Sequence, residues 1–255
     1  MCKISFFILQ TLIYPLKNVN LHTKTQMSCI IHIETSTKVC SVALSKDKKI
    51  LFNKEDYNGG SHAELLGVFV FDAVKFAKEN DFLMDAIAVS AGPGSYTGLR
   101  IGVSEAKGLC YGLDIPLIAL SSLDIMAHQV IQSGTEADYY CPMIDARRME
   151  VYSAIYDRSM KKIKEVSADI MDENSYSEII SKGKTCFFGD GSIKCKNMII
   201  SPEVIFLDDI YPLAAGMVSL AEKKYEQKEF VDLAYFEPFY LKEFMATIAK
   251  NKVIK

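Results

Sequence analysis

Four short stretches of this sequence combine glycines or polar side chains in ways that suit ligand binding. An acid followed by hydroxyl residues, Glu34-Thr35-Ser36-Thr37, comes directly after an apolar run. Glycine turns follow two other apolar runs, at Gly92-Pro93-Gly94 and at Gly189-Asp190-Gly191, and glycine allows backbone angles that other residues avoid. Asp145 precedes the pair Arg147 and Arg148, which together form a dense group of charges.

Each stretch allows a structural and a functional interpretation. The stretch Glu34-Thr35-Ser36-Thr37 forms either a plain hairpin turn or a binding site for a metal or a phosphate group. Asp145 either stabilises a hairpin whose arginines pair with surface acids, or lines a binding site. In the functional interpretation the stretches converge on a nucleotide-shaped cleft between two halves, without an obvious catalytic base. Its candidate residues are Glu34, Thr35, Ser36, Gly92, Gly94, Arg100, Asp145, Gly189 and Asp190.

Several common catalytic centres are excluded by missing residues. The four histidines, at positions 22, 32, 62 and 128, form neither His-x-x-x-His nor His-Glu-x-x-His, so zinc hydrolysis lacks its ligands. No Gly-x-Ser-x-Gly elbow occurs. No Gly-Lys-Ser/Thr follows the first glycine turn, which excludes a P-loop.

Composition describes an ordinary soluble globular protein. The formal net charge of −3 gives no electrostatic footprint for nucleic acid, whose binders usually carry a basic face. Seven scattered cysteines without a Cys-x-x-Cys pair are typical of buried free thiols in a reducing compartment.

The apolar runs predict mixed sheets flanked by helices, in two units that each begin with a hairpin and continue with strand–helix units. We divide the chain into a leader at 1–26, a first domain at 27–133 and a smaller α/β domain at 134–255. The leader carries three lysines and no acid, and its apolar run 4–16 is too short to span a bilayer. We interpret it as a non-native or disordered extension, with translation starting at Met27.

The expected helix at 96–111 is nearly bare on one face. Gly94, Gly98, Gly102 and Ala106 recur at spacing four, although each interior glycine costs about 0.5–1 kcal/mol relative to alanine. The smooth face lets the helix lie close to its own sheet, or accepts a helix from a partner, or opens a phosphate-binding loop. Ser95 or Thr97 is expected to cap the helix.

The other expected helix, 61–78, begins with a capping box at Ser61 and Glu64. Apolar residues cover well over one stripe of it, which predicts burial on two sides. It is either a central core helix or, together with the glycine-faced helix, a protein–protein interface.

Four motifs carry a resemblance to a known family. The chain contains Ile-His-Ile-Glu-Thr-Ser-Thr-x-x-Cys-Ser-Val-Ala-Leu, Ser-His-Ala-Glu-Leu-Leu, Ala-Val-Ser-Ala-Gly-Pro-Gly-Ser-Tyr-Thr-Gly-Leu-Arg-Ile-Gly and Ile-Asp-Ala-Arg-Arg-Met-Glu-Val-Tyr. Over roughly 27–241 it resembles the bacterial TsaB (YeaZ) family. The resemblance implies an actin-like, sugar-kinase-like (ASKHA) fold of two ribonuclease-H-like domains.

The resemblance also implies a function in the cytoplasm. A TsaB-like chain is expected to be a non-catalytic partner of its paralogue TsaD, which transfers the threonylcarbamoyl group to adenosine beside the tRNA anticodon, and the ATPase TsaE joins the pair. It implies no cofactor or metal of its own, no membrane contact and only indirect contact with tRNA. A further possibility is a homodimer when the partner is absent, since an exposed apolar face on the two helices should pair with something. The alternative is a stand-alone nucleotide-dependent enzyme or glycoprotease-like peptidase that uses the interdomain cleft.

In this family the two helices of the first domain form the contact with TsaD. We therefore assign the partner interface to these residues: Leu65, Phe69, Asp72, Phe76, Gly98, Gly102 and Ala106. The paralogue's His-x-x-x-His metal pair aligns with Ser122 and Met126, which are poor ligands, and this favours a scaffold. The chain departs from its family at Glu34, where Asp is usual, and at Lys242, where Arg is usual.

Overall fold

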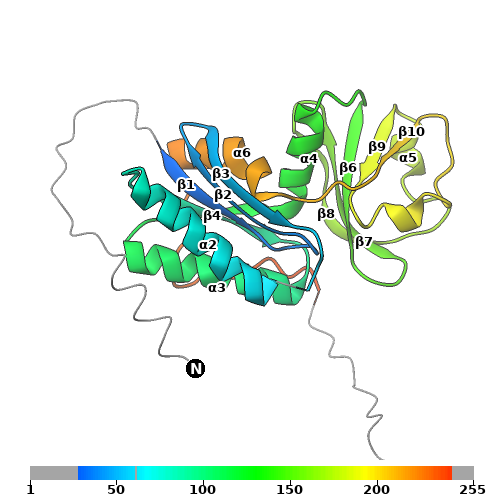
Figure 1. Ribbon diagram of the computed structural model, residues 1–255. Coiled ribbons are helices and arrows are strands. Elements are labelled where there is room, and N and C mark those ends of the chain that lie inside the picture. The colour runs from blue at the N-terminus through cyan, green and yellow to red at the C-terminus, as the bar shows by residue number, and fades with distance from the viewer. Residues whose placement is uncertain (1–27, 61, 243–255) are drawn as a thin grey trace, which may run out of the picture.

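The protein consists of two five-stranded mixed sheets that lie side by side, as the computed structural model of the chain shows (Figure 1). The structure describes residues 28–60 and 62–242. The leader prediction at 1–26, the proposed start at Met27 and the capping residue Ser61 lie outside the described residues.

The first sheet has the order β3-β2-β1-β4-β5. Its first three strands form an antiparallel meander, and β4 and β5 run parallel to β1. The central strands consist almost entirely of buried residues because both faces of the sheet are covered. The strands are β1 (Cys29–Glu34), β2 (Cys40–Lys46), β3 (Lys49–Asp56), β4 (Ala86–Gly92) and β5 (Leu117–Ser121).

Two long helices, α2 (His62–Glu79) and α3 (Tyr96–Leu113), cover one face of the first sheet. Their inward side chains, such as Val70 and Val103, join one apolar core with side chains such as Ile31 of β1. Ser95 is the N-cap of α3, since its hydroxyl accepts a hydrogen bond from the Gly98 N–H at 3.2 Å, and this confirms one of the two caps that the sequence offered.

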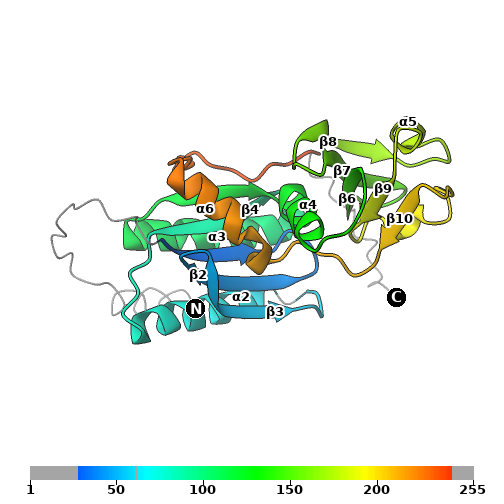
Figure 2. The same ribbon diagram turned by 90° about the horizontal axis from the view of Figure 1, so that it is seen from above.

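The opposite face of the first sheet is covered by segments from distant parts of the sequence. Helix α4 (Ser122–Gln132) lies between the two sheets, whereas η2 (Ala214–Met217) and α6 (Val218–Glu226) come from the end of the chain (Figure 2). Met217 and Ala221 pack with Ile30 of β1 and with residues of β4 and β5. The predicted second domain, 134–255, therefore contains a segment at 214–226 that packs on the first sheet.

The second sheet has the order β10-β9-β6-β7-β8 and repeats the topology of the first. Its hairpin meander and the parallel strands beside it confirm the shared order of elements predicted for the two halves. Its elements are β6 (Tyr139–Asp145), β7 (Glu150–Asp157), β8 (Lys162–Ile170), α5 (Ser177–Ile180), β9 (Thr185–Phe188), η1 (Ile193–Cys195) and β10 (Val204–Leu207).

The six cysteines in the described ranges are buried and free, as predicted, and burial raises the pKa of Cys29 to about 11. Within 28–60 and 62–242, no helix combines the length and apolarity that crossing a membrane requires.

Candidate functional site

The turn between β1 and β2 lies beneath helix α3. Thr35 and Ser36 are fully buried there, because the glycine face of α3 rests directly on them. A Cβ atom on Gly98 would lie 2.1 Å from the Thr35 carbonyl oxygen, and one on Gly102 would lie 2.2 Å from Thr35 Oγ1. Hydrogen bonds join the two segments, from Ser95 N–H to the Ser36 carbonyl at 2.6 Å and from Thr35 Oγ1 to the Gly98 carbonyl at 2.8 Å.

The glycine face of α3 therefore packs on its own chain. Gly98, Gly102 and Ala106 are buried, so assigning them to a partner interface was wrong. The physical reason is that the missing side chains allow a backbone-to-backbone approach within the first domain, which was one of the alternatives that the sequence left open.

The predicted interface residues of α2 lie on the flank of the helix that faces β3. Leu65, Phe69, Asp72 and Phe76 are half-buried. Lys54 of β3 contacts this flank, with its Nζ 2.6 Å from Asp72 Oδ2 and 5.7 Å from the centre of the Phe69 ring. These four side chains serve the packing of the edge strand, and their role toward a partner stays a prediction.

The outer surface of the α2–α3 layer carries different apolar side chains. Val68 and Phe71 of α2 are 51% and 46% exposed, and Tyr111 of α3 is 85% exposed. Gly67 and Gly108 lie on the same two helices, and a Cβ atom at either position would meet nothing within 4 Å. We call these five residues the outer helix face. None of the five residues is charged, and two of them lack a side chain, which suits a partner helix.

A cleft of about 1100 Å³ opens where the two sheets meet. Its walls are the β1–β2 turn, the N-terminal turn of α3, the β6–β7 turn and the segment 239–242. Of the predicted cleft residues, Ser36, Gly94, Asp145 and Asp190 line it. Glu34, Thr35, Gly92, Gly189 and Arg100 are not among its lining residues.

The Glu34 carboxyl lies fully buried at the end of β1. Its Oε1 accepts a hydrogen bond from the Ser36 N–H at 2.5 Å. Burial raises the pKa of Glu34 to about 7, which outweighs the stabilisation of the carboxylate by its hydrogen bonds. A buried acid of this kind has the pKa of a general base, but Thr35 and Ser36 separate it from the cleft.

Asp145 occupies the corresponding position at the end of β6. It is exposed, pairs with Lys194, and its Oδ1 accepts a hydrogen bond from the Arg147 N–H at 3.0 Å. Asp190 supports the turn, since its Oδ1 accepts from the Asp145 N–H at 3.0 Å. Burial raises the pKa of Asp190, and the nearby Asp145 carboxylate adds to this effect. The sequence therefore correctly indicated that Asp145 and Asp190 come together.

The segment 235–242 forms a wall of the cleft that the sequence did not predict. The Phe239 N–H donates to the Ala91 carbonyl at 2.7 Å, the Tyr240 ring lies 4.7 Å from the Tyr96 ring, and Lys242 pairs with Glu150 of β7. The segment thus connects the two domains. Its aromatic composition around Pro238 was the available signal, but nothing in the pattern named its partners.

The cleft and its surroundings lack an assembled metal site within the described ranges, where no group of three or more His, Cys, Asp or Glu side chains converges. Ser122 and Met126, which align with the paralogue's metal pair, are buried in α4. His128 lies 2.9 Å from Ser219 through Nε2, so its ring serves the contact with α6.

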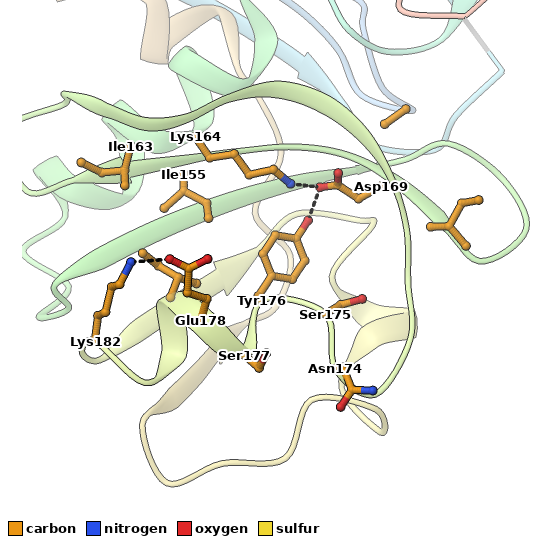
Figure 3. A pocket seen from close by; sticks show the side chains of 13 residues that line it. Ile155, Ile163, Lys164, Asp169, Asn174, Ser175, Tyr176, Ser177, Glu178 and Lys182 are labelled. Atoms are coloured by element: carbon orange, nitrogen blue, oxygen red, sulfur yellow. Dashed lines mark hydrogen bonds and ion pairs between the residues drawn. The ribbon is translucent and has the colours of Figure 1, made fainter.

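A second hollow, of about 750 Å³, lies within the second domain between β8 and the segment 174–182 (Figure 3). Asp169 is the charged centre of its lining. Lys164 Nζ and Tyr176 Oη each donate to Asp169 Oδ2 at 2.6 Å, and Ser153 and Ser167 donate as well. Burial alone would raise the pKa of Asp169, but these donors outweigh it and lower the pKa. With every donor satisfied, the cluster joins the segment to the sheet and leaves no reactive group.

Comparisons with curated proteins give relatives along most of the chain. A TsaB tRNA threonylcarbamoyladenosine biosynthesis protein from Buchnera aphidicola is 30% identical over 226 residues, covering 85% of this chain and 99% of the relative. The proteins of the same name from Escherichia coli and Haemophilus influenzae are 29% and 28% identical and cover 85% and 84% of this chain, and 96% and 93% of their own.

Solved structures agree with the sequence comparison. YeaZ from Pseudomonas aeruginosa is 26% identical with a TM-score of 0.69, covering 84% of this chain and 100% of that one. A second structure, described as a protein similar to peptidase YEAZ from Pseudomonas aeruginosa, is 27% identical with a TM-score of 0.74 and covers 85% of this chain and 100% of that one.

The family model for TsaD, the tRNA N6-adenosine threonylcarbamoyltransferase, matches residues 58–184, which include α2, α3 and the hairpin of the second sheet. The near-complete coverage of the TsaB relatives, together with the YeaZ-like arrangement of both sheets, fixes the assignment. The chain belongs to the TsaB (YeaZ) family, whose two mixed sheets flanked by helices form an ASKHA-type fold.

Proposed function

We propose that this chain is a non-catalytic subunit in the biosynthesis of threonylcarbamoyladenosine in tRNA, and that it binds a TsaD-type partner in the cytoplasm. The names of its relatives place them in this pathway, and the TsaD family model matches half of the chain. TsaE joins the pair in this proposal, and the ATP that the pathway uses is bound outside this chain.

The outer helix face is the observation that carries the proposal. Val68, Phe71 and Tyr111 are large side chains that a monomer leaves in water, although each would gain about 25 cal/mol per Å² of apolar surface on burial. Gly67 and Gly108 lie on the same two helices with open space where a side chain would be, so a partner helix can approach the backbone closely there. Apolar surface of low relief on two packed helices is the usual basis of a helix–helix interface.

The cleft supports a non-catalytic role. Glu34, whose pKa is raised to about 7, is fully buried beneath the β1–β2 turn. Asp145 and Glu150 are each held by a lysine. Among the residues lining the cleft, no nucleophile lies in a hydrogen bond with a base that a third group orients.

Size-exclusion chromatography of the chain mixed with its TsaD-type partner tests the interface. Phe71→Glu is expected to abolish co-elution, because a charged carboxylate would replace the apolar ring and would lose its water on docking. Ile170→Glu is the matched control, since Ile170 is 79% exposed on β8 of the other domain and should leave the complex intact.

The same mixtures test the absence of catalysis. Formation of threonylcarbamoyladenosine in tRNA should need both proteins, fall at least about tenfold with Phe71→Glu, and be unchanged by Glu34→Gln. Hydrolysis of a nucleotide or a peptide by the chain alone would instead support the alternative of a stand-alone enzyme. If the partner is withheld, the outer helix face should pair two copies of the chain, and Phe71→Glu should then yield a monomer.

A further inference from the structure

The β6–β7 turn presents two arginines at the rim of the cleft in an unfavourable backbone conformation. Arg147 and Arg148 both have positive φ, at 68° and 51°, where glycine or asparagine is the usual choice. Both side chains are exposed and line the cleft. A strained turn built from two long cationic residues is more costly than its Asn-Gly equivalent, and such strain is typical of functional sites.

Three carboxylates line the cleft near the turn; two of them are paired with lysines, and the third, Asp190, accepts the Asp145 N–H. Lys194 pairs with Asp145, and Lys242 pairs with Glu150. Within the described part of the chain, neither arginine has a carboxylate partner within 4.0 Å. The two lysines therefore leave the positive charge of Arg147 and Arg148 uncompensated, although the whole chain has a formal net charge of −3.

The interior of the cleft is closed to a phosphate group where the first-domain turns meet. The Ser95 N–H, which would face an anion at the start of α3, donates instead to the Ser36 carbonyl at 2.6 Å. A Cβ atom on Gly94 would lie 2.3 Å from that same carbonyl oxygen, so the two turns are in direct contact. The start of α3 therefore offers an anion no free N–H at Ser95, whereas the β6–β7 turn offers the two arginines.

Aromatic side chains and two further cations lie near the opening of the cleft. Tyr96 and Tyr240 line the cleft with their rings 4.7 Å apart, and the Arg100 guanidinium lies 4.6 Å from the Tyr96 ring centre. Lys38 lines the cleft as well, with its ammonium over the Tyr211 ring. Proteins that bind single-stranded nucleic acid usually have cations along a groove with aromatic rings beside them. The phosphates pair with the cations and the bases stack on the rings.

We propose that the rim of the cleft binds RNA, with Arg147 and Arg148 on backbone phosphates and the Tyr96–Tyr240 pair beside the bases. The site uses the β6–β7 turn and the segment 239–242, whereas partner docking uses the outer helix face, so each assignment can fail without the other. The RNA strand lies across the rim, because the contact between the Ser36 and Gly94 turns prevents deeper entry.

Fluorescence anisotropy with a labelled anticodon stem-loop tests the proposal on the full chain. Arg147→Gln with Arg148→Gln is expected to weaken binding at least about tenfold. It should also reduce the slope of log K against log salt by about 1.4, the value for two single-strand phosphate contacts. The matched control is Arg158→Gln with Lys161→Gln, which removes the same charge from exposed positions at the β7–β8 turn and should change neither quantity.

Three results would overturn the proposal. The first is no binding of the stem-loop at roughly 100 µM protein in low salt, since even non-specific RNA binders associate there. The second is an equal loss in the Arg147/Arg148 and Arg158/Lys161 variants, which would indicate a diffuse charge effect. The third is full displacement of the RNA by a mononucleotide at equal concentration, which would indicate a nucleotide site.

Discussion

The two hairpin turns at equivalent places in the two sheets differ in their exposure to solvent. The turn after β1 is sealed, with Thr35 and Ser36 without exposed surface, whereas the turn after β6 presents Arg147 and Arg148 to solvent. The acids that end the two strands follow the same division. Glu34 is buried and carries a pKa raised to about 7, and Asp145 is exposed and paired with Lys194.

The helix that follows the fourth strand of each sheet explains the difference. In the first domain this helix is α3, with 18 residues, and its glycine face covers the turn. In the second domain it is η1, with three residues. Gly191 makes a comparable approach, since its Cβ would lie 2.8 Å from the Ile144 carbonyl carbon, but too little helix follows to cover the turn. One topology thus gives a packing contact in one copy and an open rim in the other.

The largest effect should come from breaking the sealed turn. Gly98→Ala places a Cβ atom 2.1 Å from the Thr35 carbonyl oxygen and is expected to cost about 3 kcal/mol of unfolding free energy. Gly108→Ala on the same helix meets open space and should stabilise by about 0.5–1 kcal/mol. Urea denaturation of both variants measures this contrast. Equal stabilities would show that α3 does not rest on the turn.

A pH series on Glu34→Gln addresses the buried acid. The pKa of Glu34 rises from 4.5 to about 7 on folding, so the folded protein binds an extra proton between these values and wild-type stability falls as pH rises through this window. At about pH 8, Glu34→Gln should be more stable than wild type by up to about 3 kcal/mol, and the gain should shrink toward about pH 5. Urea midpoints at the two pH values give the answer. A pH-independent difference would contradict the burial of the charge.

Asp145→Asn provides the matched change in the other sheet. It removes the partner of Lys194 at an exposed position, so at about pH 8 it should cost about 0.5–1 kcal/mol. The two equivalent acids are therefore expected to give opposite signs at the same pH. A gain in stability for Asp145→Asn would remove the distinction between the turns.

At the open turn the expected effect is as small as that of Asp145→Asn. Arg147→Gly relieves a positive φ of 68° and should stabilise by about 0.5–1 kcal/mol even though it removes a charge from the RNA site. Arg158→Gly, at a position without positive φ, should be neutral or slightly destabilising. Thermal melting of both variants measures the difference, and loss of stability in Arg147→Gly would show that the guanidinium serves the fold.

Most of the architecture could be predicted from local patterns. Apolar runs gave the strands from β1 to β10, and the repeated hairpin order gave two similar sheets. The apolar residues Leu213, Met217 and Leu220 predict a single helix over 212–227, whereas the structure divides this segment at Met217 into η2 and α6. The period of the apolar residues predicts an amphipathic helix but not the point at which a 3₁₀ turn replaces it.

The candidate sites were predicted less well, since a pattern does not say which surface covers a residue. The spacing of Gly98 and Gly102 correctly indicated a close approach, but both a sheet turn and a partner helix satisfy it. Phe71 is exposed, whereas Phe69 and Phe76 of the same helix are half-buried. The sequence pattern does not distinguish the three rings, because their exposure depends on where α3 and β3 lie. Lys242 and Glu150 are 92 residues apart in sequence, so their contact follows from the tertiary fold alone.

The return of α6 to the first sheet sets the order in which the chain can complete its folding during synthesis. Ile30, Ala88 and Ile118 emerge from the ribosome early, yet Met217 and Ala221, which cover them, are made about a hundred residues after Ile118. Until then only α4 covers that side of the first sheet, and it does so in part. A fragment that stops before residue 214 would leave part of this apolar face of the first sheet exposed and is expected to aggregate. We therefore expect that the two halves cannot fold as separate modules.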